Sequence, residues 1–314
     1  MAKTFPTRLV VFTAAGLLLA GCSTGEPVDA AHLTIATTPA ALDQATSLAV
    51  AEYVVSQGAD VEIQSHDDHE AVFAALDDET ASDHEAIAVV TTPQQADTQD
   101  SAPQLPGDVD IVAQAPAELG LTPTASTVTA AQFAQAQNEQ AVADDQTDPA
   151  CADLTWLHTV TAQEEIDDLR TALAEVGCEP AFESTGAIDS DTYEEMTRRL
   201  ITEDQTVAVL SSVDPVIADQ GLATLELETE QWPNTNMVAV ASTDINESLA
   251  AHVTAVVEEL DSEAATDLLR GYHNAQTSTS DLQYEVDDAI RYWLANQDLM
   301  DDDTVTDFST DDVE

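Results

Sequence analysis

The sequence predicts an α/β fold made of two lobes, each built on a parallel or mixed sheet, with a ligand cleft between them. A strand–helix–strand–helix–strand pattern occurs twice, and its first and third strands begin 53 residues apart both times. The stretch 207–241 starts as a short apolar strand, breaks at Ser, Asp and Pro, and returns as a second apolar strand. Apolar runs bounded in this way are typical of covered parallel strands. We therefore predict that this stretch forms the floor of the cleft and the crossover back to the first lobe.

The first half of the chain predicts three strands with two helices between them, followed by a fourth strand. Short apolar or alternating runs bounded by turn residues indicate the strands, and apolar residues spaced three or four apart indicate the helices. Gly58 stands where a C-cap glycine ends the first helix. The expected elements are strands at 33–36, 61–64, 86–90 and 110–113, a helix ending near residue 57, a helix containing Val72, Phe73 and Leu76, and a short helix around Phe133 within 122–140.

The second half repeats the pattern and then returns to the first lobe. The segment 164–176 is a clear amphipathic helix, with its apolar side chains on one face and Gly177 after it. After the return strand, apolar positions at helical spacing predict two more helices, around 249–260 and 286–294. The remaining expected elements are strands at 154–157, 179–183, 207–210 and 237–241 and a helix at 190–201.

The ends of the chain carry signals for location rather than for fold. Residues 1–21 combine Lys3 and Arg8 with an apolar run and small residues, as in a signal peptide. The ending Leu-Ala-Gly-Cys resembles the bacterial lipobox, which predicts a lipid on Cys22 and attachment to the outer side of the cell membrane. An ordinary signal peptide followed by a chance Cys is the alternative. The expected segments are a tether at 22–32, the first lobe at 33–120 and 237–300, the second lobe at 121–236, and a solvated acidic tail at 301–314.

The chain is extremely acidic, with 61 Asp and Glu, seven Lys and Arg, and a net charge of −54. The segment after residue 21 keeps five Arg and no Lys. Such a surface repels nucleic acid, so no nucleic-acid partner is expected. It also repels itself, which predicts a fold that salt stabilises by screening.

Two cysteines, Cys151 and Cys178, remain after Cys22. An even number of cysteines in an oxidising compartment predicts one disulfide between them. Two buried free thiols are the alternative, because the sequence does not give the distance between the two residues.

Hydroxyl-bearing residues stand at the carboxyl ends of the predicted parallel strands. In open α/β sheets ligands bind beyond these ends, where hydroxyl groups and backbone N–H groups can hydrogen-bond a polar or anionic group. Each hydroxyl can equally cap the helix that follows, so we expect the set, rather than every member, to line the cleft. The six ends are Thr37 and Thr38, Ser65 and His66, Thr91 and Thr92, His158 and Thr159, Ser184 and Thr185, and Ser211 and Ser212.

Three motifs stand in the last third of the chain: SVDPVIADQGL at 212–222, WPNTNMVAV at 232–240 and DDAIRYWLANQDL at 287–299. In this order they resemble the DPxIxxxGL segment, the FPPYNVAPV crossover and the closing AxxFLxxxGL helix of the glycine betaine/choline (osmoprotectant) binding proteins of ABC importers. Residues 33–92 resemble the first lobe of that family more loosely. The resemblance implies a periplasmic-binding-protein-like fold that closes around a small solute.

The chain also departs from that family. Residues 38–44 read Thr-Pro-Ala-Ala-Leu-Asp-Gln, where the family usually has a Phe-Thr-Glu-Gln-like turn. At the end of the third strand this chain has only Thr91 and Thr92, where the family usually has a Tyr-Thr-Gly-like sequence. The family's Arg-containing loop in the second lobe is absent after Leu157. A quaternary ammonium is normally held by aromatic faces, yet only 4% of this chain is aromatic.

Five residues are expected at particular places in the cleft. Trp156, Tyr193 and Trp232 are the candidates for its aromatic walls, and each is also a candidate core residue. Asp214 and Asn234 are expected at the cleft floor and at the crossover.

Enzyme motifs are absent from the sequence. Eight glycines follow Cys22 and no two are closer than nine residues, which excludes a Walker loop and a dinucleotide fingerprint. No lysine follows Lys3, which excludes a Schiff base on a lysine after residue 21. The motif Gly-x-Ser-x-Gly does not occur. We therefore expect neither catalysis, nor a cofactor, nor a resident metal. The run His-Asp-Asp-His-Glu at 66–70 leaves a divalent-metal site as a minor alternative.

These observations together predict a substrate-binding lipoprotein of an ABC importer. It is expected to be a monomer held on the extracytoplasmic side of the cell membrane through Cys22, to bind a small polar solute such as glycine betaine or choline, and to deliver it to a permease in the membrane. Two alternatives stay open. One is an interaction or scaffold lipoprotein that keeps the fold without the pocket, and the other is a metal-binding importer component that uses His66 and His69.

Overall fold

The structure of the protein is a computed structural model. The predicted signal peptide, Cys22, Thr159, Thr185, Trp232 and the tail beyond residue 301 lie outside the described residues, so the expectations placed on them stay predictions. The described residues are 32–76, 85–93, 105–106, 109–117, 119–142, 151, 154–158, 163–175, 178–179, 182–184, 190–225, 227, 234–242, 245–277 and 285–301.

The first lobe is built on strands in the order β2-β1-β3-β10, with β4 also paired to β10. β1 runs parallel to β2 and β3, whereas β10 runs antiparallel to both β3 and β4. The strands are β1 (His32–Thr37), β2 (Asp60–Ser65), β3 (Glu85–Pro93), β4 (Asp110–Gln114) and β10 (Asn234–Ala241).

The second lobe is built on strands in the order β5-β8-β6-β7, with the short β9 also paired to β5. β6 runs parallel to β7 and β8, whereas β5 runs antiparallel to β8 and β9. The strands are β5 (Leu119–Ala125), β6 (Thr155–His158), β7 (Phe182–Ser184), β8 (Thr206–Ser211) and β9 (Ala223–Thr224).

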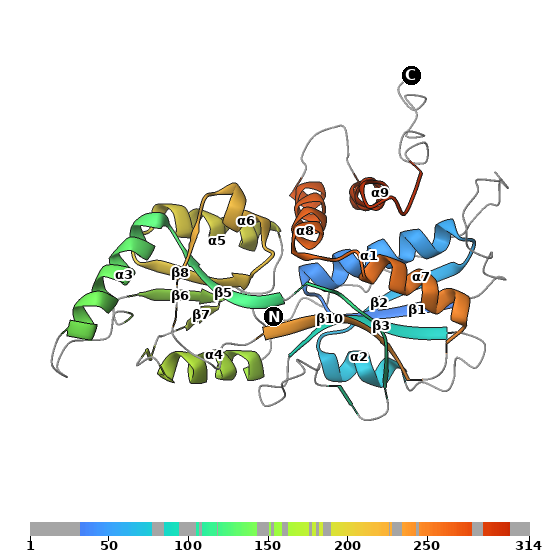
Figure 1. The fold of residues 1–314 in the computed structure, drawn as a ribbon, viewed down its shortest axis with the longest axis horizontal. Coiled ribbons are helices and arrows are strands. Elements are labelled where there is room, and N and C mark those ends of the chain that lie inside the picture. The colour runs from blue at the N-terminus through green and yellow to red at the C-terminus, as the bar shows by residue number, and fades with distance from the viewer. Residues whose placement is uncertain are drawn as a thin grey trace, which may run out of the picture.

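The two sheets join at β5 and β10. Leu119 and Gly120, at the start of β5, pair with the start of β10, and Leu121 onward pairs with β8. One ladder of backbone hydrogen bonds therefore runs from one lobe into the other (Figure 1). Both joining strands are antiparallel to their neighbours, which makes the two sheets mixed rather than purely parallel.

Helices cover both faces of each sheet, as two apolar faces require. In the first lobe, α1, α7, α8 and α9 lie over one face and α2 over the other; in the second lobe, α5 and α6 lie opposite α4 (Figure 1). Among the described residues no helix has the length and apolar character needed to cross a membrane. The helices are α1 (Ala41–Ser56), α2 (His69–Leu76), α3 (Thr127–Val142), α4 (Gln163–Glu175), α5 (Ser190–Thr202), α6 (Pro215–Asp219), α7 (Glu247–Val257), α8 (Ser262–Thr277) and α9 (Val286–Asn296).

Most of the predicted elements form where the sequence pattern placed them. The strand–helix–strand–helix–strand unit occurs once in each lobe, and Gly58 ends α1 with a φ of 100°, a backbone conformation that favours glycine. The predicted disulfide also forms, with an S–S distance of 1.99 Å between Cys151 and Cys178. It joins the segment before β6 to the segment after α4 in the second core, which rules out two free thiols.

Two elements were not predicted, and two predicted elements have other bounds. A helix forms around Phe133 as predicted, but it is the 16-residue α3. The start of the 122–140 segment belongs to strand β5, which was not predicted, because Leu121 to Ala125 pairs with β8. The strand predicted at 179–183 is described as β7, from Phe182. In the part of the chain that the structure describes, three helices follow β10, because α8 lies between the two that were predicted.

Candidate functional site

The carboxyl ends of β3 and β8, one in each lobe, lie beside the joining strands. Thr92, at the end of β3, lies opposite Asn236 near the start of β10, and Asn234 lies opposite Gly120 of β5. Ser211, at the end of β8, lies opposite Leu121, one residue further along β5. Two of the six strand ends predicted to line a cleft therefore flank the region where the two sheets join.

In the first lobe, the predicted hydroxyl groups are largely used inside the protein. Thr37 is buried, and its hydroxyl donates to the carbonyl of Val89 at 3.2 Å. The Thr38 hydroxyl donates to the carboxylate of Asp43 at 2.6 Å, and the Thr91 backbone N–H donates to the other oxygen of Asp43 at 2.9 Å. These contacts hold the hydroxyl groups inside the protein, but they are not the helix caps that the sequence left open as the alternative.

Thr92, Asn236 and Gln114 form another group of polar side chains, at the end of β3, on β10 and on β4. Thr92 is 1% exposed, and its hydroxyl has no hydrogen-bond partner, which is uncommon for a buried polar atom. The opposite residue, Asn236, is also buried, and its side-chain carbonyl accepts a hydrogen bond of 3.3 Å from the Gln114 amide. The sequence predicted Thr92 but neither Asn236 nor Gln114 at this place.

In the second lobe, the segment after β8 is held by its polar side chains. The Ser212 hydroxyl accepts a hydrogen bond of 3.1 Å from the backbone N–H of Gly120, where the chain crosses between the lobes. Asp214 caps α6 by accepting from the Val216 N–H at 3.0 Å. Asn234 is exposed at the start of β10, on the other side of Gly120. Asp214 and Asn234 thus both lie near the crossover between the lobes, and neither is among the residues that line the cavity described next.

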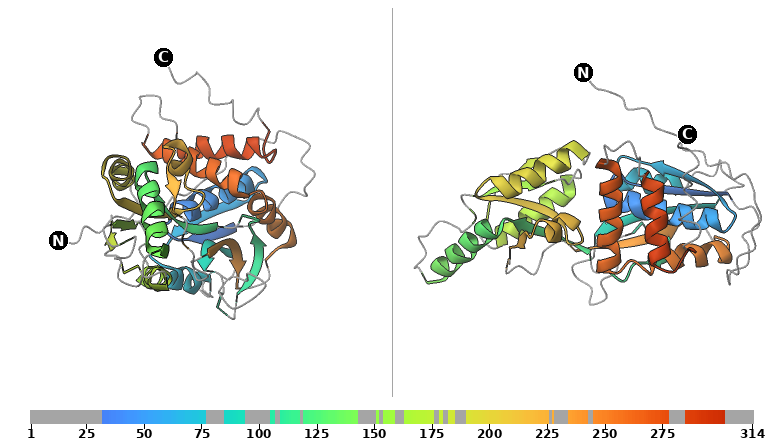
Figure 2. Two further views of the ribbon diagram at one scale, coloured as in Figure 1. Left: turned by 60° about the vertical axis from the view of Figure 1, so that its left-hand side comes forward. Right: turned by 90° about the horizontal axis from the view of Figure 1, so that it is seen from above.

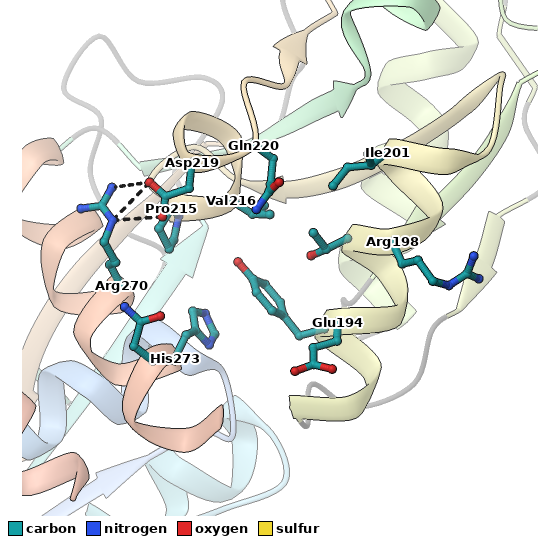
Figure 3. A pocket seen from close by; sticks show the side chains of 12 residues that line it. Glu194, Arg198, Ile201, Pro215, Val216, Asp219, Gln220, Arg270 and His273 are labelled. Carbon is teal, nitrogen blue, oxygen red and sulfur yellow. Dashed lines mark hydrogen bonds and ion pairs between the residues drawn. The ribbon is translucent and has the colours of Figure 1, made fainter. Parts of the chain in front are cut away.

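A cavity of about 370 Å³ lies between the lobes (Figure 3). Its first-lobe wall is α8, and its second-lobe walls are α5 and α6. The volume falls within the range of small-molecule pockets. The lining residues are Tyr193, Glu194, Thr197, Arg198, Ile201, Pro215, Val216, Asp219, Gln220, Arg270, His273 and Asn274.

Tyr193 is the predicted wall residue that lines this cavity. Its hydroxyl donates to the Asp214 carboxylate at 2.5 Å, and its ring stacks on the imidazole of His273 with centroids 4.4 Å apart and planes at 16°. Burial raises the pKa of Asp214, and the hydrogen bonds from Tyr193 and Val216 oppose that shift. Burial lowers the pKa of His273 to about 4, so the imidazole is neutral at neutral pH.

Three of the four charged residues that line the cavity have a partner of opposite charge. Arg270 donates from Nε and Nη2 to the Asp219 carboxylate at 3.1 Å each, and Arg198 donates to Glu195 and points away from the cavity (Figure 3). The fourth is Glu194. Thr197 holds a buried hydroxyl that has no hydrogen-bond partner. The cavity therefore combines one ion pair across its walls with an aromatic ring and a polar group able to bind a ligand atom.

Trp156, the other aromatic wall candidate among the described residues, is not among the lining residues of this cavity. Trp156 is fully buried in the second core, where its ring packs edge-on to Phe182 at 6.1 Å. His158, at the end of β6, is also buried and packs edge-on to Phe182 at 5.8 Å. The placement of Trp156 matches the core role that the sequence left open.

The histidines of the 66–70 run lie apart from any cluster of potential metal ligands. The Nε2 atom of His69 lies 2.8 Å from the carbonyl oxygen of Thr91. The part of the chain that the structure describes brings no three His, Cys, Asp or Glu side chains together in a metal-like arrangement.

The first-lobe wall of the cavity is helix α8, which was not predicted from the sequence. A signal was present: Ala265, Leu268, Leu269 and Tyr272 have helical spacing and are all buried. Asp261 caps the helix by accepting from the N–H groups of the second and third residues that follow it. Arg270 and His273 stand on the opposite side of this helix and could have been placed with it.

No known family model and no curated protein matches the chain in sequence. Solved structures match it in fold. Apo YehZ from Escherichia coli matches with a TM-score of 0.50 and 14% identity, covering 85% of this chain and 99% of that one. Lactococcal OpuAC, closed on glycine betaine, matches with a TM-score of 0.56 and 9% identity over 85% and 96% of the chains.

A choline binding protein of an ABC transporter, in complex with choline, matches with a TM-score of 0.57 and 11% identity, covering 87% of this chain and 91% of that one. These similarities confirm the predicted two-lobed α/β fold. They also agree with the resemblance found in the sequence, because the structural neighbours include glycine betaine and choline binding proteins. At this identity they show the fold alone.

Proposed function

We propose that this chain is the extracytoplasmic solute-binding lipoprotein of an ABC importer. It is anchored through a lipid on Cys22, binds a small polar solute between its lobes, and hands the solute to a membrane permease. The fold that it shares with glycine betaine and choline binding proteins supports the solute-binding role. The lipobox at Cys22 supports the anchor.

The observation that carries this proposal is the cavity of about 370 Å³ between α5, α6 and α8. Its walls come from both lobes, so a solute in it touches both at once. A ligand that contacts both lobes favours the closed arrangement by the difference in its affinity for the two states. The same cavity speaks against the alternative of a scaffold protein that has lost its pocket.

The chemistry of the cavity favours a solute without net charge, such as a zwitterion. Arg270 and Asp219 neutralise each other, and Tyr193 and Thr197 offer an aromatic ring and a hydroxyl. A desolvated net charge would cost free energy here unless the protein supplied an opposite one. Glycine betaine and related quaternary ammonium solutes fit this description, and their cationic end suits an aromatic ring.

The test is a thermal-shift screen of residues 23–314 in high salt against glycine betaine, choline, carnitine, proline betaine, ectoine and zinc. A solute at about 100 times its Kd stabilises the folded state by roughly 2.7 kcal/mol, which raises the melting temperature by a few degrees. We expect this shift with a quaternary ammonium solute.

Two Tyr→Ala variants serve as a matched pair in this screen. Tyr193→Ala should remove most of the shift, whereas Tyr292→Ala, on an exposed ring of α9, should keep it. If the protein is well folded and none of the solutes changes its melting temperature, the osmoprotectant assignment is contradicted. A shift with zinc alone would favour the metal-binding alternative.

A further inference from the structure

Helix α8 belongs to the first lobe but touches the second. Leu268, Leu269 and Tyr272 pack in the first core, and the carbonyl of Ala264 accepts a hydrogen bond of 2.9 Å from the Trp293 indole of α9. The opposite side of α8 faces α5 and α6 (Figures 1 and 2). α8 is therefore fixed in one lobe and makes side-chain contacts across the gap to the other.

The first contact across the gap is an ion pair with two hydrogen bonds. Arg270 presents Nε and Nη2 to the carboxylate of Asp219, the last residue of α6 (Figure 3). Arg270 also contacts Asp267, one turn earlier on α8. Paired bonds from a planar guanidinium fix direction as well as distance, which a single exposed ion pair does not.

The second contact is the stack of His273 on Tyr193 of α5, with ring centroids 4.4 Å apart. Tyr193 is itself held by its hydrogen bond to Asp214, and Asp214 is fixed as the cap of α6. One face of α8 thus binds α5 and α6 together, through residues three positions apart on one side of the helix.

The net charge of the whole chain makes an attractive contact between the lobes important. With a net charge of −54, the lobes repel each other. The ion pairs of Arg198 and Arg199 lie within the second lobe, and that of Arg291 with Glu52 lies within the first. The Arg270 pair, in contrast, places a positive charge against an acidic residue of the opposite lobe.

We propose that Arg270, Asp219, His273 and Tyr193 form a clasp that holds the two lobes together in the solute-free protein. The clasp sets the fraction of molecules whose cleft is open and so tunes access to the cavity that it borders. This role does not depend on which solute is bound, and it stands or falls separately from the proposed transport function.

The clasp can be tested by measuring a distance between the lobes without any solute. Spin labels on Val128→Cys in α3 and Tyr292→Cys in α9 mark the two lobes, because both positions are exposed. The native cysteines are joined in a disulfide, so only the introduced thiols of residues 23–314 react. Pulsed electron paramagnetic resonance then gives the distribution of distances between the labels.

We expect Arg270→Gln with His273→Ala to shift this distribution to longer and broader distances. Loss of both contacts should change the ratio of open to closed molecules by roughly tenfold. The matched control is Arg170→Gln, which removes the same charge from an ion pair within α4 and should leave the distribution unchanged. Arg270→Asp alone and Asp219→Arg alone should each lengthen the distance between the labels. The double variant with both substitutions exchanges the two charges and should restore the shorter distance.

An unchanged distribution in the folded double variant would overturn the clasp, and so would an equal shift in Arg170→Gln. Circular dichroism of each variant separates a change in lobe arrangement from unfolding. Solute binding can persist or fail in these variants without affecting the conclusion, because the distances are measured in its absence.

Discussion

Asp43 shows how a single buried carboxylate organises the cleft edge of the first lobe. It is fully buried near the start of α1, accepts from the Thr38 hydroxyl and the Thr91 N–H, and lies near His69. These three neighbours favour the carboxylate, but burial outweighs them and raises the pKa of Asp43 to about 6, from an ordinary value of 3.8. Its protonation therefore depends on pH in a range where most carboxylates are already ionised.

We expect Asp43→Asn to change how stability depends on pH. Between about pH 4 and pH 6 the folded protein keeps a proton on Asp43 that the unfolded chain has released. The contribution of Asp43 to the free energy of unfolding is therefore larger at low pH and is lost as the pH rises through about 6. The amide in the variant cannot ionise, so the stability of the variant relative to the unchanged protein should rise by about 1–3 kcal/mol from pH 4 to pH 7. Urea unfolding at both pH values in high salt measures this. An equal difference at the two pH values would show that Asp43 titrates normally.

At the scale of single elements, the disulfide fixes α4 to the second sheet. Cys151 precedes β6 and Cys178 follows α4, and both are buried beside Leu173 and Trp156. The bond closes a segment with a sequence separation of 27, which restricts the unfolded chain more than the folded one. α5 and α6, which line the cavity, pack on the opposite face of that sheet. The disulfide therefore supports the second lobe without forming part of the site.

Removal of the disulfide should destabilise the second lobe and leave the cavity intact. For Cys151→Ala with Cys178→Ala we expect a loss of about 2–4 kcal/mol in the free energy of unfolding. Unfolding in urea, with and without a reducing agent, provides the measurement. The reductant should lower the stability of the unchanged protein to that of the variant and should not affect the variant. A variant as stable as the oxidised protein would contradict this role.

The whole molecule is dominated by its negative charge. Few cations offset the net charge of −54, and each of the described Arg residues is paired with at least one carboxylate. The remaining carboxylates repel one another across the surface at low ionic strength. Salt shortens the range of this repulsion from about 30 Å at 0.01 M to about 3 Å at 1 M.

We expect the melting temperature of residues 23–314 to rise steadily as sodium chloride increases from about 0.01 M to 1 M, the range over which screening changes most. The physical reason is that the folded state concentrates negative charge, and screening lowers the free energy of that state more than that of the expanded chain. A non-ionic osmolyte at equal osmolarity serves as the control for effects other than screening. A melting temperature that does not change with salt would refute charge repulsion as a major term.

Most of the local structure and the class of fold can be predicted from the sequence alone. Apolar runs fixed most strands because burying them is favourable wherever they pair, and Gly58 marked the end of α1 because its φ of 100° suits few other residues. β5 was missed because its Gly120 and Pro123 disfavour a strand locally, and the strand forms through its pairing with β8.

Only the tertiary structure decided which candidate residues meet. Trp156 and Tyr193 are both aromatic and both were candidates for the cleft wall, but Trp156 lies in β6 and packs in the second core, whereas Tyr193 lies in α5 at the gap between the lobes. Arg270 and Asp219 are 51 residues apart, so no local pattern could pair them. Local sequence sets which elements form, because periodicity and turn chemistry act over a few residues. The site depends on contacts between distant segments, which arise only when the two lobes pack against each other.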